Sequence, residues 1–599
     1  MDRRDFLKSV VTGLGAVAAG PILSAPNPAR AATPERPNVI LVLTDDQGYG
    51  DVSGHGNPVL KTPHIDALRK QSHRFTDFHV APMCTPTRGQ LLTGRDALAN
   101  GATFVCQGRS MMRHDLPTMA EVFAAGGYRT GHFGKWHLGD SYPHRPQDRG
   151  FQETVSHGAW GITSIADYYG NDYYDDTYRH NGRRETYKGY CTDVWFDLAM
   201  TYMRTCQAKG EPFFVYLPTN CPHSPHWVAE QYSAPYNRKG VPAPFFGQIA
   251  NIDENVGKLV AMLDATNLAE NTVLIFMTDN GTVRGDRIFN AGMRGKKCQL
   301  WEGGHRVPCY IRWPAGNLGT PRDIDELTGC QDLLPTLIAL CGLKPPRDWR
   351  PDGTSLAGLL RSSDAQLPDR MLVVQYGANP KRGNATVMWK KWRLVNDKQL
   401  FNVRTDPHQD KDVATEHPDI VKRMQAHYAA WWARVQPQFQ ETRYIHLGSD
   451  KANPIMLYSS DWQGAYADNF GNLAAGNGIG AWHVIVERAG TYEITLRRWA
   501  PEADTALDAP LVGPRGKGKA VPIVAARVRI GDADVAKPAP SGATSVSFTV
   551  PLKAGKTRLE TWFHNRNGKA LCSAYYTSVE RKAPDGNAAM TTGEQRRFA

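Results

Sequence analysis

The 599-residue sequence predicts an α/β protein with a mostly parallel central sheet, followed by two smaller parts made of antiparallel strands. Uninterrupted apolar segments such as residues 39–43 are typical of strands that are buried on both faces of a parallel sheet. These segments alternate with amphipathic helical patterns, as they do in α/β domains. Beyond about residue 440, apolar residues alternate within short segments, which is typical of a β-sandwich.

The alternating patterns place one large α/β domain at residues 32–350. Thr62 and Pro63 occupy the expected N-cap and first helical position of TPHIDALRKQSHRF. The helix pattern LPTMAEVFAAGG precedes the strand pattern of YRTGHFGKWHLG, and IANIDENVGKLVAMLDATNL precedes NTVLIFMTDNG. A chain of this length exceeds what one hydrophobic core supports, so we expect further domains.

Residues 351–440 predict a small antiparallel sheet with one helix. LVVQY, ATVMW, WRLV and QLFNV are short strands at hairpin spacing, and HPDIVKRMQAHYAAWWARV is the helix. Residues 441–585 predict a separate β-sandwich, because TYEITLRRW and SVSFTV each place alternate apolar residues on one face. Its tryptophans, Trp482, Trp499 and Trp562 among them, are core residues by default, and a polysaccharide-binding face is the alternative. Residues 586–599 form a polar tail.

Residues 1–31 have the pattern of an export signal. Arg3, Arg4 and Lys8 precede a short apolar stretch, and Ala29-Arg30-Ala31 offers a cleavage site. RRDFLK resembles a twin-arginine signal, although Asp2 stands where Ser or Thr is usual. We expect export by the twin-arginine machinery to the periplasm or the medium, with a general secretory signal or an uncleaved anchor as alternatives. No later apolar run approaches the roughly 20 residues of a membrane span.

The net charge of +11 is compatible with anionic substrates. Nucleic acid is not an expected partner, because the sequence has no basic helix, zinc-ligand spacing or aromatic RNA-binding motif. The ten cysteines match no small disulfide scaffold and no paired-cysteine zinc pattern, so we expect most of them to be buried thiols.

Two strand patterns end in the same way. ILVLTDD ends in Asp45 and Asp46, and LIFMTDN ends in Asp279 and Asn280. Ligands of open α/β sheets bind beyond the carboxyl ends of the strands. Four oxygen-bearing side chains there predict a site for a hard divalent cation, Ca²⁺ or Mg²⁺. A helix cap or a turn is the alternative for one copy, and the presence of two copies favours the metal.

The segment CTPTRGQLLTG places Cys84 and Arg88 near the start of a helix, where an anion site is expected. A low-pKa thiolate nucleophile is one interpretation of Cys84. Together with the two strand ends, GKWHLG and RGKKCQLWEGGHRVP, the C-x-P-x-R motif resembles the type I sulfatases of the alkaline-phosphatase superfamily. The resemblance runs from about Pro37 to Val435 with its motifs in order, and LFNVRTDPHQDKDVATEHP resembles the C-terminal subdomain of that family. It implies an alkaline-phosphatase-like fold for the α/β part.

In that family the motif cysteine is oxidised to formylglycine. The resemblance therefore implies that Cys84 is converted by a formylglycine-generating enzyme before export. Twin-arginine export suits this order of events, because it carries folded proteins. Thr87 stands where Ser is commoner. The hydrated aldehyde has two hydroxyl groups, one to attack sulfur and one to expel the sulfate later. An unmodified thiol nucleophile is the alternative.

The resemblance also implies a calcium site, in preference to magnesium, whose ligands are Asp45, Asp46, the modified Cys84, Asp279 and Asn280. It assigns Arg88 to orienting the formylglycine hydrate and offsetting the carboxylates.

Four further residues receive roles from the family motifs. Lys135 and Lys297 contact the sulfate group, with Lys296 as the neighbour that is easily confused with Lys297. His137 takes the proton that allows the sulfated intermediate to collapse, and His223 protonates the leaving alcohol. Lys135 and His137 lie two residues apart, so an extended segment points both the same way.

Candidates for substrate contact are less specific. His226 follows His223 in TNCPHSPHW, and His305 replaces the usual aliphatic residue of GGxRVP. The segment IADYYGNDYYDDTYRHNGRRETYKGYCTDVWF is rich in residues that stack on sugars or bind hydroxyl groups. We interpret it as a substrate-binding insertion, with Tyr168, Tyr169, Asn171 and Asp172 as candidates. A purely structural, tyrosine-rich loop is the alternative.

These observations predict an exported sulfatase that hydrolyses sulfate esters of small molecules or saccharides. One alternative is a phosphodiesterase or phosphonate monoester hydrolase with the same fold and the same modified residue. GKWHLG and the second lysine favour sulfate. Another alternative is a non-catalytic carbohydrate-binding relative, which the complete set of motif residues disfavours.

Overall fold

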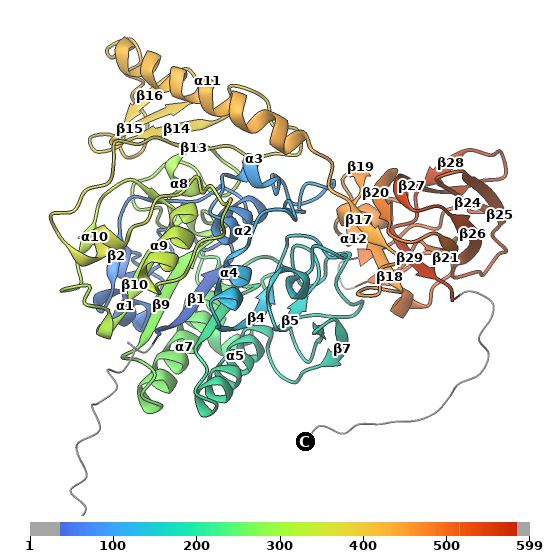
Figure 1. The fold of residues 1–599 in the computed structure, drawn as a ribbon, viewed down its shortest axis with the longest axis horizontal. Coiled ribbons are helices and arrows are strands. Elements are labelled where there is room, and N and C mark those ends of the chain that lie inside the picture. Colours follow the sequence, from blue (N-terminus) through green and yellow to red (C-terminus); the bar gives the residue numbers. More distant parts are fainter. Residues whose placement is uncertain (1–35, 514–515, 584–599) are drawn as a thin grey trace, which may run out of the picture. The chain divides into compact units, whose positions relative to one another are not determined.

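The computed structural model describes residues 36–513 and 516–583 (Figure 1). It contains a ten-stranded sheet, and the strand that starts at Asn38 lies inside this sheet. In spatial order the strands are β11 (Asp323–Ile324), β2 (His73–Phe75), β10 (Cys309–Arg312), β9 (Thr272–Thr278), β1 (Asn38–Thr44), β8 (Phe213–Pro218), β4 (Arg129–Lys135), β5 (Glu153–His157), β6 (Thr177–His180) and β7 (Arg183–Thr186). The five strands from β9 to β5 pair in parallel. The predicted mostly parallel sheet is confirmed. The predicted signal peptide and polar tail lie outside the described residues.

Helices cover both faces of this sheet, and the strand β1 packs against both layers (Figure 1). Val39, Leu41 and Leu43 share a core with one helix layer, and Ile40 and Val42 share a core with the other. The first layer contains α2 (Cys84–Thr93), α4 (Met119–Ala125) and α9 (Leu333–Leu340), and the second contains α1 (Pro63–Lys70), α5 (Cys191–Ala208) and α7 (Ala243–Ala265). Each such fully buried side chain stabilises the fold by about 1.5–3 kcal/mol, which holds the end of β1 in place.

The local signals for helix starts are confirmed. Pro63 begins α1 after Thr62, and α4 begins with a capping box between Thr118 and Glu121. The helix α2 begins at Cys84 and ends before Gly94, whose φ of 67° lies in the left-handed region that glycine adopts without strain. The cysteine of the motif therefore occupies the first turn of a helix.

The predicted small antiparallel sheet with one helix follows. Its strands are β13 (Leu372–Val374), β14 (Thr386–Trp389), β15 (Trp392–Val395) and β16 (Gln399–Asn402), and its helix is α11 (Pro418–Gln440). Figure 1 shows α11 along this sheet, and Val387 and Leu394 pack against Tyr428 and Trp431 of the helix.

A buried arginine fastens this small sheet to the large domain. The Arg393 guanidinium donates to Glu302 at 2.7 Å and to Asp77 at 2.7 Å, and the arginine side chain is fully buried. Burial alone would raise the pKa of Glu302, but the charge of Arg393, together with smaller contributions from His79 and His305, lowers it to about 2. Arg393 is the largest of the charges that compensate each of the two carboxylates.

The predicted β-sandwich is also present. One sheet contains β17 (Ile445–Leu447), β20 (Gly480–Val486), β27 (Gly555–His564), β24 (Ala525–Ile530) and β25 (Ala533–Pro538), and the other contains β18 (Ile455–Tyr458), β29 (Tyr576–Arg581), β21 (Gly490–Arg497) and β26 (Val546–Leu552). The alternate residues Tyr492, Ile494 and Leu496 are buried between the sheets, as expected. Trp482 and Trp499 are core residues. Trp562 is half-buried, and the guanidinium carbons of Arg527 and Arg529 each lie 5.4 Å from its ring centroid.

Among the described helices, none is long and apolar enough to cross a membrane.

Replacing Arg393 by methionine should destabilise the protein by about 3–5 kcal/mol at pH 7, because two buried carboxylates lose their cation. A carboxyl group whose folded pKa lies below its unfolded value stabilises the fold above the unfolded pKa and loses this contribution as the pH falls. The deficit of the variant should therefore shrink between about pH 4.5 and pH 2, the two pKa values of Glu302. Chemical denaturation across this range measures it. Arg404→Met, which breaks an exposed ion pair with Asp325, is the control and should change stability by less than about 1 kcal/mol. Equal stability of the two variants would contradict the role of Arg393.

Candidate active site

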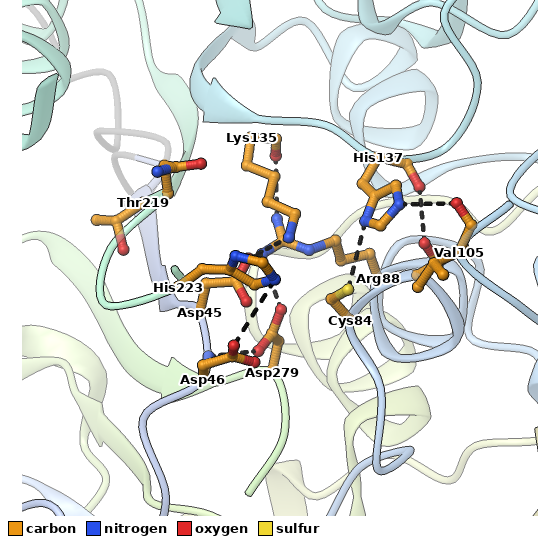
Figure 2. A network of polar contacts seen from close by, with 12 residues as sticks. Asp45, Asp46, Cys84, Arg88, Val105, Lys135, His137, Thr219, His223 and Asp279 are labelled. Carbon is orange, nitrogen blue, oxygen red and sulfur yellow. Dashed lines mark hydrogen bonds and ion pairs between the residues drawn. The ribbon is translucent and has the colours of Figure 1, made fainter. Parts of the chain in front are cut away.

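Four oxygen-bearing side chains meet beyond the ends of two neighbouring strands, and Figure 2 shows the three carboxylates among them. Thr44 at the end of β1 pairs with Thr278 at the end of β9, so the residues that follow them lie side by side. The four residues are Asp45, Asp46, Asp279 and Asn280, and each is at most 1% exposed. The structure thus brings together the carboxylates that the two similar strand ends predicted.

Three cationic side chains, each from a different segment, reach these carboxylates. The Arg88 guanidinium, from α2, lies 3.2 Å from Asp45 and 2.9 Å from Asp279. Lys135, the last residue of β4, pairs with Asp45. Lys297 lies in a loop, and its Nζ is 2.6 Å from Oδ1 of Asp46. Its neighbour Lys296 pairs with Asp286 instead. The structure therefore separates the two adjacent lysines and turns Lys297 towards the carboxylates.

The cations determine how the carboxylates ionise. Burial alone would raise the pKa of Asp45 and of Asp46, but Lys135 and Lys297, respectively, are the largest of the charges that hold these pKa values below the usual range. Burial and the charge of Asp45 together raise the pKa of Asp279 to about 7, despite the opposing charge of Arg88. Asp279 is therefore the carboxylate whose negative charge the three cations compensate least.

The side chains fit a hard divalent cation. Oδ1 of Asp45 and Oδ1 of Asn280 are buried, and neither has a hydrogen-bond partner among the described residues. A carboxylate oxygen of Asp45, one of Asp279 and Sγ of Cys84 lie within 4.8 Å of one another. Carboxylate and amide oxygens are the ligands that Ca²⁺ and Mg²⁺ prefer. A cation would satisfy the buried oxygens that the three protein cations leave unpaired.

Cys84 faces a histidine and not one of the cations. Its Sγ lies 3.3 Å from Nδ1 of His137, while Nε2 of His137 lies 3.1 Å from the Val105 carbonyl oxygen (Figure 2). A carbonyl oxygen only accepts, so Nε2 carries the proton and Nδ1 is the acceptor that faces residue 84. Burial raises the pKa of the Cys84 thiol to about 11, although Lys135 and Lys297 act to lower it. Residue 84 thus points at a free imidazole lone pair.

Lys135 and His137 both reach the centre, but not through the strand alternation that we expected. The strand β4 ends at Lys135, and His137 has a φ of 59°, in the left-handed region. This turn directs the imidazole towards Cys84 while Lys135 reaches Asp45. The backbone conformation was not predictable from a two-residue spacing.

His223 stands on the other side of the carboxylates. Its Nδ1 donates to the Ser224 carbonyl oxygen at 2.8 Å, which leaves Nε2 facing Asp46 at 3.7 Å. Its ring centroid lies 5.0 Å from that of Trp160, and the Tyr173 hydroxyl donates to its backbone carbonyl at 3.1 Å. Burial lowers the pKa of His223 to about 4. A bound anion beside Nε2 would raise it.

The two other histidine candidates make different contacts. Nδ1 of His226 lies 3.0 Å from the Gln248 side-chain oxygen. Nδ1 of His305 lies 2.9 Å from Nδ1 of His79 and the residue is fully buried, so His305 belongs to the polar network that contains Glu302. These contacts place His305 in the packed interior and not beside the carboxylate cluster.

The candidates in the tyrosine-rich insertion contact the insertion itself or the β-sandwich. Asn171 is buried and donates to Asp167, and Asp172 accepts from the Tyr174 amide in a turn. Tyr168 packs beside Arg179 and Arg184, and the Tyr169 hydroxyl donates to the Val512 carbonyl of the sandwich. The insertion approaches the centre through Tyr173 instead, and nothing in the sequence distinguishes this residue from the other six tyrosines of the insertion.

Two other groups at the site were missed. The Val105 carbonyl, which fixes the tautomer of His137, is a backbone atom and leaves no trace in the sequence. Trp160, which packs on His223, is 7% exposed, and nothing in its sequence distinguishes it from an ordinary core tryptophan.

Comparison with known proteins identifies the family. The Sulfatase family model matches residues 37–343. N-acetylgalactosamine-6-sulfatase of Rattus norvegicus is 30% identical over 488 residues, covering 74% of this chain and 86% of the relative. An ulvan-active sulfatase of Formosa agariphila is 29% identical and covers 63% of this chain and 77% of its own. The structure of Ps i-CgsB in complex with k-i-k-neocarrahexaose superimposes with a TM-score of 0.62 and 28% identity, covering 68% of this chain and 94% of that one. The chain therefore belongs to the sulfatase family and is a sulfuric ester hydrolase of the alkaline-phosphatase superfamily.

Proposed function

We propose that this protein is an exported sulfatase that removes sulfate from sulfated carbohydrates by means of a formylglycine at position 84 and a bound Ca²⁺ ion. The observation that carries the proposal is the arrangement around Cys84. A residue in the first turn of a buried helix faces an imidazole lone pair, next to a carboxylate cluster and two lysines.

The names of similar proteins support a carbohydrate substrate. One relative is an N-acetylgalactosamine-6-sulfatase, another is an ulvan-active sulfatase, and the structure of Ps i-CgsB holds a neocarrahexaose. All three concern saccharides, so a sulfated saccharide is the substrate class that we propose.

The modified side chain would supply a geminal diol, with one hydroxyl group to attack sulfur and one to release the sulfate afterwards. The chain's own residues would manage the protons. Nδ1 of His137 is the free acceptor 3.3 Å from the residue-84 side chain, and the Val105 carbonyl holds the other nitrogen protonated. A base in this tautomer accepts a proton from the residue-84 hydroxyl without rearranging.

Lys135 and Lys297 flank the carboxylates from two sides and would hold the sulfate oxygens. Nε2 of His223 would donate a proton to the leaving alcohol, since the Ser224 carbonyl keeps Nδ1 protonated and orients the ring. An acid of this kind requires a pKa near the working pH, which the negative sulfate group beside His223 would restore.

The oxygens of Asp45, Asp46, Asp279 and Asn280, with residue 84, would hold the Ca²⁺ ion, which would polarise the sulfate ester. Arg88, which bridges Asp45 and Asp279, would keep these ligands in place. Export through the twin-arginine route after modification by a formylglycine-generating enzyme fits the N-terminal sequence.

Hydrolysis of a nitrophenyl sulfate, compared with a bis-nitrophenyl phosphate, tests the function. We expect the sulfate ester to be the better substrate, because two lysines are available for a sulfate group with three free oxygens. Release of sulfate from N-acetylgalactosamine 6-sulfate, ulvan oligosaccharides and neocarrahexaose then tests the carbohydrate class. Faster hydrolysis of the phosphate diester would instead support the phosphodiesterase alternative.

Mass spectrometry of the exported protein tests the modification. The peptide containing residue 84 should have lost one sulfur and two hydrogen atoms and gained one oxygen relative to cysteine. Cys84→Ala should lower kcat by more than about 10³-fold without changing the melting temperature, as loss of a catalytic nucleophile does. Cys572→Ala, a buried thiol of the sandwich, is the control and should keep its kcat. An enzyme that hydrolyses sulfate esters at the wild-type rate while its residue-84 peptide still has the mass of unmodified cysteine would refute the proposal.

Removal of the metal should lower stability as well as activity. An ion that binds only the folded state stabilises it by about 2.7 kcal/mol at a hundredfold excess over its Kd. Chelation should therefore lower the melting temperature, and added Ca²⁺ should restore it. Asp279→Asn should lose this calcium-dependent shift, whereas Asp532→Asn, an exposed carboxylate, should retain it. An unchanged melting curve after chelation would argue against a bound cation.

A further inference from the structure

A short segment of the β-sandwich, residues 464–469, lies against two separate parts of the sulfatase domain. We call it the rim segment. On one side, the Gln107 side chain donates to the Gly464 carbonyl at 2.7 Å. On the other side, the Trp160 indole donates to the Asp468 carbonyl at 2.8 Å, and the Ile165 amide donates to the same oxygen at 3.1 Å. Ser164 forms a β-bridge with Asn469. Hydrogen bonds thus anchor both ends of the segment to the catalytic domain.

Both anchoring points lie next to residues of the candidate active site, one in space and one along the chain. Trp160 packs on His223, the proposed acid. Gln107 lies two residues after Val105, whose carbonyl oxygen holds Nε2 of His137. The rim segment therefore contacts the stretch of chain that holds His137 and, through Trp160, the residue that packs on His223.

Tyr466 lies in the middle of the rim segment. The residue is 41% exposed, while the following residues Ala467 and Asp468 are 0% and 2% exposed. The ring centroid lies 6.2 Å from that of Phe104, in an edge-on arrangement. Burial raises the pKa of Tyr466, and the charges of Asp468, Cys106 and Cys84 contribute. Tyr466 thus lies at the surface beside Phe104, the residue that precedes Val105, whose carbonyl oxygen contacts His137.

We propose that Tyr466 of the β-sandwich is a substrate-binding residue, on whose ring the sugar that carries the sulfate ester packs. This inference rests on the proposed function. A flat aromatic ring offers an apolar face to the C–H groups of a pyranose and leaves the hydroxyl groups free for polar contacts. The charged centre recognises sulfate, and the rim segment recognises what the sulfate is attached to.

Trp562 offers a comparison within the same domain. It lies on β27 between Arg527 and Arg529, and these arginines pair with Asp534 and Glu560. It is therefore an aromatic residue at the surface of the sandwich that takes no part in the rim segment. Its substitution controls for a general effect of removing an aromatic ring from this domain.

The test compares Tyr466→Ala, Tyr466→Phe and Trp562→Ala on the saccharide from the panel above that the wild-type enzyme cleaves best. Loss of about 1.4 kcal/mol of ring contact corresponds to a tenfold change. We expect Tyr466→Ala to raise KM about tenfold with a smaller change in kcat. Tyr466→Phe should keep a KM within about twofold of wild type, because the ring and not the hydroxyl group makes the contact. Trp562→Ala should match the wild type.

A wild-type KM for Tyr466→Ala, or an equal rise in KM for Trp562→Ala, would overturn the proposal. If Tyr466→Ala melts at a lower temperature than the wild type, the phenylalanine variant decides. A KM of Tyr466→Phe that is raised as much as that of Tyr466→Ala would then overturn the proposal. Wild-type hydrolysis of nitrophenyl sulfate separates the two levels of inference. Failure of that reaction refutes the proposed function, whereas normal hydrolysis with an unchanged saccharide KM in Tyr466→Ala refutes only the role of Tyr466.

Discussion

Three carboxylates buried at the ends of β1 and β9 impose the main constraint on this structure. Removing such groups from water costs several kcal/mol each unless opposite charges compensate them. Arg88, Lys135 and Lys297 supply the compensation from a helix, a strand end and a loop. Each of these segments is held in position by a charge pair, so the pairs that permit burial also assemble the candidate active site.

The same charges explain why a metal and a sulfate group belong together here. Three carboxylates and three cations balance, and a divalent cation added to them leaves an excess of two positive charges. The single negative charge of a bound sulfate ester offsets half of this excess, and the sulfate dianion that hydrolysis releases offsets all of it. In a buried site an uncompensated charge is expensive, so the cation favours the anion and the anion favours the cation. With the proposed cation bound to the carboxylates, the two lysines that pair with Asp45 and Asp46 would be free to contact sulfate oxygens.

Much of this centre was predictable because it depends on local rules. The carboxyl ends of parallel neighbours meet at one edge of a sheet, so two similar strand ends predicted the carboxylate cluster. The start of α2 at Cys84 followed from the sequence around it. The contacts of His305 and of the tyrosine-rich insertion were not predictable, since they depend on which distant segment packs against each residue. His79 and Arg393, which define the surroundings of His305, lie more than 80 residues away in the sequence.

Substrate selection must then arise outside the charged centre. A sulfate group and its bridging oxygen are common to all sulfate esters, so groups that recognise only sulfate cannot distinguish one sugar from another. Discrimination requires side chains that touch the alcohol part, where a stacked ring or an unmatched hydroxyl group changes the free energy of binding by about 1–3 kcal/mol. The contact proposed for Tyr466 is of this kind, and Tyr466 comes from a domain that contributes none of the charged residues of the centre. The charged centre can therefore stay constant while the rim changes, which separates the chemistry of the reaction from the choice of substrate.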